Sequence, residues 1–324
     1  MINILLNTIL FSIMLLFNSI PCSAKDSGLP FLWGVAIDGY PITASNLKSI
    51  ENEIKISPQI VVFFLQWPSA ASNDIVFPET TLDVIWQNGA IPCMTWEPMY
   101  YEKNEEKIIS YQRIIKGEYD PYIEAFAKKT ASFEKTFIIR FAHEMNIERY
   151  HWGTDKKGYG PDSPKLYKHL FKYVVSKFKE AGGKKVLWAF CPNAESVPNT
   201  SYDKSASWNQ VINYYPGDEY VDILGIDGYN WGTTQTLEKN GWKSDWKSFK
   251  DIFSPTYHVL KSIAPSKPIF IFETASANQG GDKSVWVKEA FKTAEQWGIQ
   301  GLIWFHVNKE IDWRFNSKDL MEKK

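Results

Sequence analysis

The stretch FIIRFAHEMN, residues 137–146, joins a short apolar run to a cluster of polar groups. Residues Phe137–Ala142 are apolar except for Arg140, and His143, Glu144 and Asn146 follow directly. A short run that is apolar on both alternating faces is typical of a strand buried in a parallel sheet. The stretch therefore predicts a buried strand whose carboxyl end carries candidate catalytic groups.

Seven further runs of this kind occur along the chain. They are Phe31–Ile37, Ile60–Gln66, Ala90–Thr95, Lys185–Phe190, Asp222–Asp227, Pro268–Phe272 and Gly301–Phe305. Segments with apolar residues at helical spacing lie between these strands. Helices are predicted over Ala44–Asn52, Thr80–Asn88, Pro121–Ser132, Pro164–Ala181, Trp246–Ser262 and Ser284–Trp297, with a shorter one near Ser205–Tyr214.

Eight buried strands that alternate with helices predict an α/β fold, a (β/α)8 TIM barrel, formed by a single domain over residues 25–324. A doubly wound sheet is the structural alternative, and it usually carries a glycine-rich phosphate loop after its first strand. The segment Gly34–Gly39 reads GVAIDG and lacks the GxGxxG pattern. We therefore exclude a nucleotide-binding fold. Two long insertions, Lys156–Pro164 and Thr233–Ser244, are expected to form walls of a cleft.

The first 24 residues are interpreted separately, as a signal peptide. Ile4–Ile20 is mostly apolar and ends near the small residues Cys22, Ser23 and Ala24, which is typical of a cleaved secretory signal. The mature chain would then begin near Lys25 and be secreted. An uncleaved membrane anchor and a lipid anchor on Cys22 are the alternatives, and neither is preferred.

Composition restricts the partners. A net charge of −1 gives no electrostatic reason to expect nucleic acid. We expect a monomer. Cys93 and Cys191 are too few for a disulfide framework and are interpreted as buried thiols. The chain contains 14 Trp, 16 Tyr and 20 Phe, and this aromatic content suggests flat ligands such as sugar rings.

Two acidic residues occupy equivalent places in the predicted barrel. Glu144 follows the fourth strand and Glu273 ends the seventh, and active sites of such barrels lie at the carboxyl ends of the strands. Two facing carboxyl groups suit glycosidic cleavage, in which one protonates the departing oxygen and the other attacks the sugar carbon. A separation of about 5–5.5 Å would give retention and about 6.5–9.5 Å inversion. The alternative is a pair of scaffold carboxylates that form salt bridges with Arg140 or His143.

Other chemistries have little support in the sequence. His143 and Glu144 begin an HExxH-like pattern, but position 147 is Ile, so no zinc site is expected. A GxSxG nucleophile elbow is also missing. His169 and His258 are expected on helix surfaces, whereas His306, after the eighth strand, could line the pocket.

Aromatic residues also follow or end the predicted strands. At least three of them are expected to contact sugar, because pyranose faces pack on Trp and Tyr rings. The candidates are Trp67, Trp96, Trp152, Tyr229, Trp231 and Trp304.

Three segments resemble glycoside hydrolase family 26. Arg140–Asn146 with the downstream Trp152-Gly153, Tyr214–Tyr229, which contains YYPGD and GIDGY, and Glu273–Ser276 are similar to its motifs in the same order. The resemblance implies a retaining barrel enzyme with Glu144 as acid/base and Glu273 as nucleophile, and no cofactor or metal. It also implies that His143 and Tyr229 hydrogen-bond the nucleophile. Substrate contacts are expected from Trp96, Trp152, Asn146, Trp231, Trp304 and Asp227.

The resemblance points to β-1,4-mannan as substrate, with mixed-linkage β-glucan and β-1,3-xylan as alternatives. Residues 146–152 read NIERYHW, where many mannanases resemble N-G-x-W-Y-P-W-G, so the loop beside the cleaved sugar departs from the mannanase pattern. A barrel that binds polysaccharide without cleaving it, and an enzyme acting on the cell's own exopolysaccharide, are the alternatives from other classes.

Overall fold

The computed structural model describes residues 31–70, 76–150, 152, 158–183, 185–316 and 318. The predicted signal peptide over residues 1–24 lies outside the described residues and stays a prediction. Within the described ranges, no helix combines the length and the hydropathy needed to cross a lipid bilayer.

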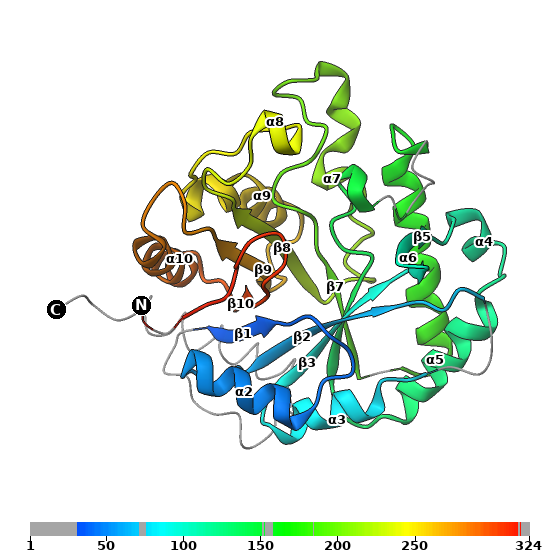
Figure 1. The fold of residues 1–324 in the computed structure, drawn as a ribbon. Helices are drawn as coiled ribbons and strands as arrows, with labels where there is room; N and C mark the ends of the chain where they lie inside the picture. The colour runs from blue at the N-terminus through cyan, green and yellow to red at the C-terminus, as the bar shows by residue number, and fades with distance from the viewer. Residues whose placement is uncertain are drawn as a thin grey trace.

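Eight parallel strands close into a barrel at the centre of the molecule (Figure 1). The order around the barrel is β1-β10-β9-β8-β7-β6-β3-β2, so each strand lies beside the next barrel strand in the sequence and the last closes on the first. The strands are β1 (Leu32–Ala36), β2 (Ile60–Gln66), β3 (Ile91–Glu97), β6 (Phe137–Phe141), β7 (Val186–Phe190), β8 (Ile223–Asn230), β9 (Ile269–Ser276) and β10 (Gly301–Phe305). The predicted TIM barrel is confirmed.

Helices cover the outside of the barrel because their apolar faces pack on the strands (Figure 1). The main ones are α2 (Ala44–Ile54), α3 (Glu79–Gln87), α5 (Asp120–Ser132), α6 (Ser163–Glu180), α9 (Phe249–Ile263) and α10 (Lys283–Trp297). Sequence fixes several of their ends. Thr43 and Ser248 form capping boxes at the starts of α2 and α9, and Gly298 ends α10 in the left-handed conformation.

Some elements were not predicted from the sequence. A hairpin of β4 (Met99–Glu102) and β5 (Glu105–Ile108) extends beyond β3, and α4 (Tyr111–Ile115) follows it. The hairpin is mostly polar and its strands pair only with each other, so it has no buried alternation to reveal it. The insertion after β8 contains α8 (Leu237–Asn240), and the predicted short helix is split into η3 (Lys204–Asn209) and α7 (Val211–Tyr214).

Strand β9 contains an irregularity at the residues that matter for chemistry. Ile226 of β8 pairs with Ile271, but the next residue, Asp227, pairs with Glu273. On the other side, Leu302 pairs with Ile271 and Trp304 with Thr274. Both neighbours therefore show one extra residue in β9 after Ile271, which is a β-bulge, and the pairing with β8 places it before Glu273. The prediction that Glu273 ends this strand is wrong, because β9 continues to Ser276 and Glu273 lies within it.

Candidate active site

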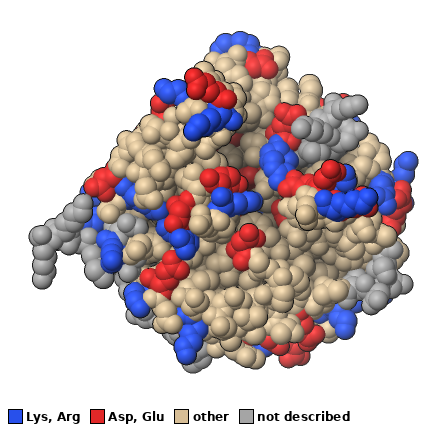
Figure 2. Space-filling view, viewed as in Figure 1, with Lys and Arg blue, Asp and Glu red and all other residues tan. Residues whose placement is uncertain are grey.

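A pocket of about 290 Å³ opens at the carboxyl ends of the barrel strands. This is the end at which barrels of this kind bind ligands. Acidic and basic side chains are interspersed over the face viewed in Figure 2, and neither sign forms a continuous field. The lining residues include both predicted acids, together with Phe64, Gln66, Glu97, His143, Tyr150, Tyr229, Trp231, Phe305 and Trp313.

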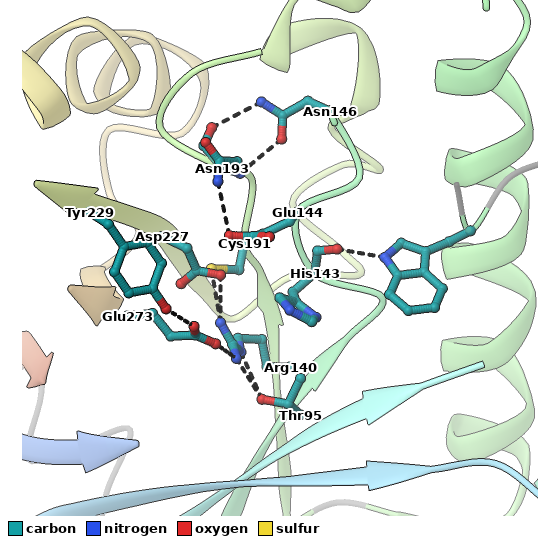
Figure 3. Close-up of polar contacts among 11 residues, drawn as sticks. Thr95, Arg140, His143, Glu144, Asn146, Cys191, Asn193, Asp227, Tyr229 and Glu273 are labelled. Carbon is teal, nitrogen blue, oxygen red and sulfur yellow. Dashed lines mark hydrogen bonds and ion pairs between the residues drawn. The ribbon is translucent and has the colours of Figure 1, made fainter. Parts of the chain in front are cut away.

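Glu273 is held at both carboxylate oxygens. The bulge in β9 turns its side chain into the pocket, where Tyr229 donates a hydrogen bond to Oε2 and Arg140 donates one to Oε1 (Figure 3). The hydrogen bond implied for Tyr229 is therefore present. Burial and the nearby Glu273 carboxylate raise the pKa of Tyr229 well above its usual range, so the phenol keeps its proton and remains a donor.

Arg140 connects the acids beneath the pocket. Its fully buried guanidinium binds Glu273 and, at 2.6 Å, Asp227, and it also donates to Thr95 Oγ1 at 2.7 and 2.9 Å. A buried charge is tolerated only when it is paired and hydrogen-bonded, and here one cation is shared by two carboxylates. His143, Asp227 and Glu273 also bring ligand atoms within 4.8 Å of one another, but Arg140 already supplies the positive charge between the two carboxylates.

Glu144 sits on strained backbone at the end of β6. Its φ is 51°, a left-handed conformation that is unusual for a residue other than glycine, and its N–H donates to Cys191 O at 2.7 Å. Its carboxyl is buried, and Asn193 Nδ2 donates to Oε1 at 2.9 Å. Burial, aided by the Glu273 carboxylate, raises the pKa of Glu144 from 4.5 to about 7, against a smaller lowering by Asn193.

Asn146 supports this arrangement from outside the pocket. Asn193 lies between Asn146 and Glu144 (Figure 3): its N–H donates to Asn146 Oδ1 at 2.8 Å, and Asn146 Nδ2 donates to Asn193 O at 2.9 Å. Asn146 is fully buried and does not line the pocket, so its predicted substrate contact is wrong. It orders the loop after β7 that carries Asn193.

His143 lines the pocket, but it does not make the predicted bond. No hydrogen bond joins its ring to Glu273 in the described part of the chain, where Arg140 and Tyr229 donate to that carboxylate instead. Burial, aided by Arg140 and Arg149, lowers the pKa of His143 well below 6.5, so the ring is neutral. Asp227 is likewise wrong as a substrate contact, since it is fully buried against Arg140.

Three of the predicted substrate-binding tryptophans point away from the pocket. Trp67, Trp96 and Trp304 are at most 2% exposed. Trp96 packs between the barrel and the helices, where Nε1 donates to Tyr122 OH at 3.2 Å, and Trp304 Nε1 donates to Trp313 O at 2.7 Å. Successive side chains of a strand face opposite sides, and the pocket is instead lined by the adjacent Gln66, Glu97 and Phe305.

Trp152 is also excluded from the pocket. It is 1% exposed, its ring stacks on Tyr150 with centroids 5.0 Å apart, and its Nε1 donates to His143 O at 2.5 Å. Tyr150 takes the place beside the pocket that Trp152 was expected to fill. Of the aromatic candidates, Tyr229 and Trp231 line the pocket, fewer than the three expected.

Two residues of the site, Glu97 in the pocket lining and Asn193 beside Glu144, were not identified from the sequence. Glu97 ends β3 and accepts a hydrogen bond from Gln66 Nε2 at 2.5 Å, and burial raises its pKa to about 7 despite that bond. Glu97 and Asn193 both follow or end strands at their carboxyl ends, so the positional rule that selected Glu144 could have found them.

The predictions for the remaining histidines and the cysteines can also be compared with the structure. His306 is absent from the pocket lining, and its Nε2 lies 3.4 Å from Glu53 Oε2. His169 and His258 are on exposed helix positions, and Cys93 and Cys191 are buried free thiols, as predicted.

An eight-stranded barrel with two buried carboxyl groups facing one pocket at its catalytic end has the architecture of a glycoside hydrolase. The chain belongs to glycosyl hydrolase family 26, whose sequence pattern it matches over residues 86–250.

Known proteins support the same assignment. The chain is 36% identical over 284 residues to Endoglucanase H of Acetivibrio thermocellus. This match covers 86% of the chain but only 28% of the length of Endoglucanase H. It is 29% identical over 167 residues to a mannan endo-1,4-beta-mannosidase of Bacillus subtilis, covering 44% of the chain and 41% of the relative. A solved Bacillus subtilis mannanase has a TM-score of 0.62 and 18% identity, covering 90% of this chain and 85% of the other, and shows the same fold.

Proposed function

We propose that this protein is a retaining, endo-acting β-glycanase that cleaves a β-linked glucan. One observation carries glycosidic cleavage: two carboxyl groups face the same pocket in different environments. Retention is proposed from the membership of family 26. Burial keeps the proton on Glu144 near neutral pH, whereas Arg140 and Tyr229 donate to both oxygens of Glu273. Pairs of acids with contrasting environments are how one site provides both an acid and a nucleophile.

In the first step, a carboxylate oxygen of Glu273 attacks the anomeric carbon as the glycosidic C–O bond breaks. Glu144 transfers its proton to the departing oxygen, which leaves as the hydroxyl of the cleaved chain. The product is a glycosyl ester on Glu273. Arg140 and Tyr229 orient the attacking carboxylate, and the neutral His143 adds no charge beside the developing positive sugar carbon.

In the second step, Glu144 is ionised and accepts a proton from a water molecule. The water oxygen attacks the anomeric carbon, the ester bond to Glu273 breaks, and Glu144 is protonated again. Because the first step needs a protonated Glu144, its pKa of about 7 predicts that turnover falls as the pH rises through that region.

The substrate proposal follows from the relatives and from one loop. The relative matched over 86% of the chain is called an endoglucanase, whereas the mannosidase match covers 44%. Residues 146–152 also depart from the mannanase pattern beside the cleaved sugar. β-1,4-Mannan is the second candidate, favoured by the mannosidase relatives. We also propose that the segment over residues 1–24 directs secretion and that the protein is a monomer.

The test is sugar release by the mature protein from mixed-linkage β-glucan, linear β-1,4-mannan and β-1,3-xylan. Glu144→Ala and Glu273→Ala are expected to lose at least about a thousandfold in kcat, since each removes a group that acts in bond cleavage. Circular dichroism would confirm that both variants fold. The anomeric form of the first product, followed by NMR, checks retention.

Two results would contradict the proposal. A folded Glu273→Ala variant that retains wild-type turnover would exclude the nucleophile assignment. Binding of a polymer without any product would favour the alternative of a non-catalytic polysaccharide-binding barrel. Sugar release from mannan alone would support the proposed reaction but would show that the substrate is β-1,4-mannan and not a β-glucan.

A further inference from the structure

An exposed tryptophan stands just outside the pocket. Trp242 is 44% exposed and belongs to the insertion that follows β8. Its ring is nearly perpendicular to that of Trp231, with centroids 5.6 Å apart. The Trp231 ring in turn packs on the Trp313 ring, with centroids 4.8 Å apart. Trp231 and Trp313 line the pocket, and Trp242 does not. The three rings therefore form a continuous aromatic row that runs from the pocket to the surface.

The insertion holds Trp242 in a fixed position relative to Trp231. Ser244 N donates to Gln235 O at 3.2 Å, and Gln235 N donates to Ser244 Oγ at 3.1 Å, which closes the base of the loop. Between these residues, Thr236 caps α8, and Gly241 ends it with φ 75°, directly before Trp242. These local bonds order the loop before any ligand arrives, which reduces the entropy lost on binding.

The start of the insertion is anchored on the loop after β9. Thr233 N donates to Gln279 O at 3.2 Å, and a Cβ on Gly232 would lie only 1.9 Å from that oxygen. Glycine is therefore required at this approach. The aromatic row is thus built on β8 and on the strand that carries Glu273.

Polar groups accompany the exposed ring. Lys243 and Asp245 follow Trp242 and form an exposed ion pair at 3.1 Å, so both remain accessible to hydroxyl groups. Sugar sites combine an aromatic face with a few polar partners, because a pyranose ring has an apolar face and a polar edge. The neighbourhood of Trp242 provides both.

We propose that Trp242 forms an additional sugar-binding subsite, adjacent to Trp231, for the part of a β-glycan chain that extends out of the pocket over the β8 insertion. The inference rests on the proposed function and adds to it. It makes Trp242 a residue that distinguishes long substrates from short ones and touches no reacting atom.

The test compares long and short substrates in the full chain. For the polymer that the wild type cleaves, Trp242→Ala is expected to raise KM about tenfold with kcat within about twofold, which corresponds to about 1.4 kcal/mol of binding free energy. An aryl β-disaccharide of the same sugar should be cleaved with unchanged KM, because it is too short to reach the subsite. Trp242→Phe should restore most of the polymer affinity.

Leu237→Ala is the matched control, since Leu237 is 68% exposed in the same insertion and offers no aromatic ring. An equal effect of both variants, or an unchanged polymer KM in Trp242→Ala, would overturn the subsite. Affinity electrophoresis in gels containing β-glucan or β-mannan tests binding separately from hydrolysis. Retardation of the wild type that is lost in Trp242→Ala supports the subsite even if no sugar is released, whereas equal mobility overturns it.

Discussion

At the scale of single residues, the pocket contains buried carboxyl groups whose ionisation is unfavourable. Glu144 and Glu97 are both buried carboxyl groups with pKa values raised to about 7, because desolvation disfavours their charged forms. Among the described residues neither forms a salt bridge, in contrast to Glu273, which is paired with Arg140. The site therefore places two buried acids that favour their protonated forms near a carboxylate that is paired with Arg140, which suits proton transfer and costs stability when the protons leave.

This cost predicts a pH-dependent gain from Glu144→Gln. A carboxyl whose pKa is raised from 4.5 to about 7 contributes fully to stability below about pH 4.5 and loses that contribution as the pH rises through about 7. Glutamine does not titrate and can still accept the bond from Asn193. The melting temperature of Glu144→Gln, relative to that of the wild type, should therefore rise by several degrees as the pH increases from about 5 to about 8. The conversion is about 2–4 °C per kcal/mol.

Calorimetry over this pH range, with Glu134→Gln at an exposed position as control, measures the difference. Melting temperatures of Glu144→Gln and the wild type that stay parallel from acid to alkaline pH would show that burial of Glu144 does not carry this energetic penalty.

At the scale of elements, the β4-β5 hairpin is joined to the segment that carries Glu144. Glu106 of β5 forms an ion pair with Arg149 in η1 (Glu148–Tyr150), and the Arg149 guanidinium lies 4.7 Å from the Tyr150 ring centroid. Tyr150 packs on the His143 ring with centroids 4.7 Å apart. A chain of contacts thus runs from a surface hairpin to the residue next to Glu144.

Glu106→Gln is expected to lower kcat/KM about fivefold while changing the free energy of unfolding by less than about 1 kcal/mol, since exposed ion pairs add little stability. Glu105→Gln breaks an ion pair with Lys107 inside the same hairpin and is the matched control. Kinetics of Glu106→Gln, Arg149→Gln and the double variant check the coupling. Strictly additive effects, or an equal loss in Glu105→Gln, would show that the ion pair does not position the loop.

At the scale of the whole molecule, the tryptophans fall into two groups with different roles. Trp96 packs in the layer between β3 and the helices, against Phe126 and Phe178, whereas Trp231 is half-buried in the pocket wall. The barrel therefore separates residues that stabilise the fold, in the layer between strands and helices, from residues that line the pocket at the carboxyl ends of the strands.

Substitution of these two residues should separate stability from activity. Trp96→Ala is expected to lose about 3–5 kcal/mol of unfolding free energy, while the folded fraction keeps its kcat. Trp231→Ala should change stability by less than about 1 kcal/mol and lower kcat/KM at least about tenfold. Denaturant unfolding and kinetics per folded molecule measure both. If Trp96→Ala does not fold, Trp96→Phe provides the smaller perturbation, and a specific fall in its kcat would contradict the separation.

Much of this organisation follows from local sequence. The alternation of apolar runs with helical periodicity predicted all eight barrel strands, and the β2 and β10 boundaries match those observed. The same reasoning placed Glu144, Tyr229, Trp231 and Glu273 at the catalytic end, where they line one pocket. These features depend on hydrophobic pattern and on position at strand ends, both of which are local properties of the chain.

Tertiary structure alone decided which neighbouring side chains face the pocket and what holds them. Side chains alternate with a period of two, so an error of one residue moved Trp67, Trp96 and Trp304 from the helix layer into the predicted site. The Arg140 ion pairs join residues 87 and 133 positions apart, and the bulge in β9 forms only against its neighbours β8 and β10. Sequence determined the barrel and its two acids, because pattern is local; the charge network around them arises only when distant strands meet in the closed barrel.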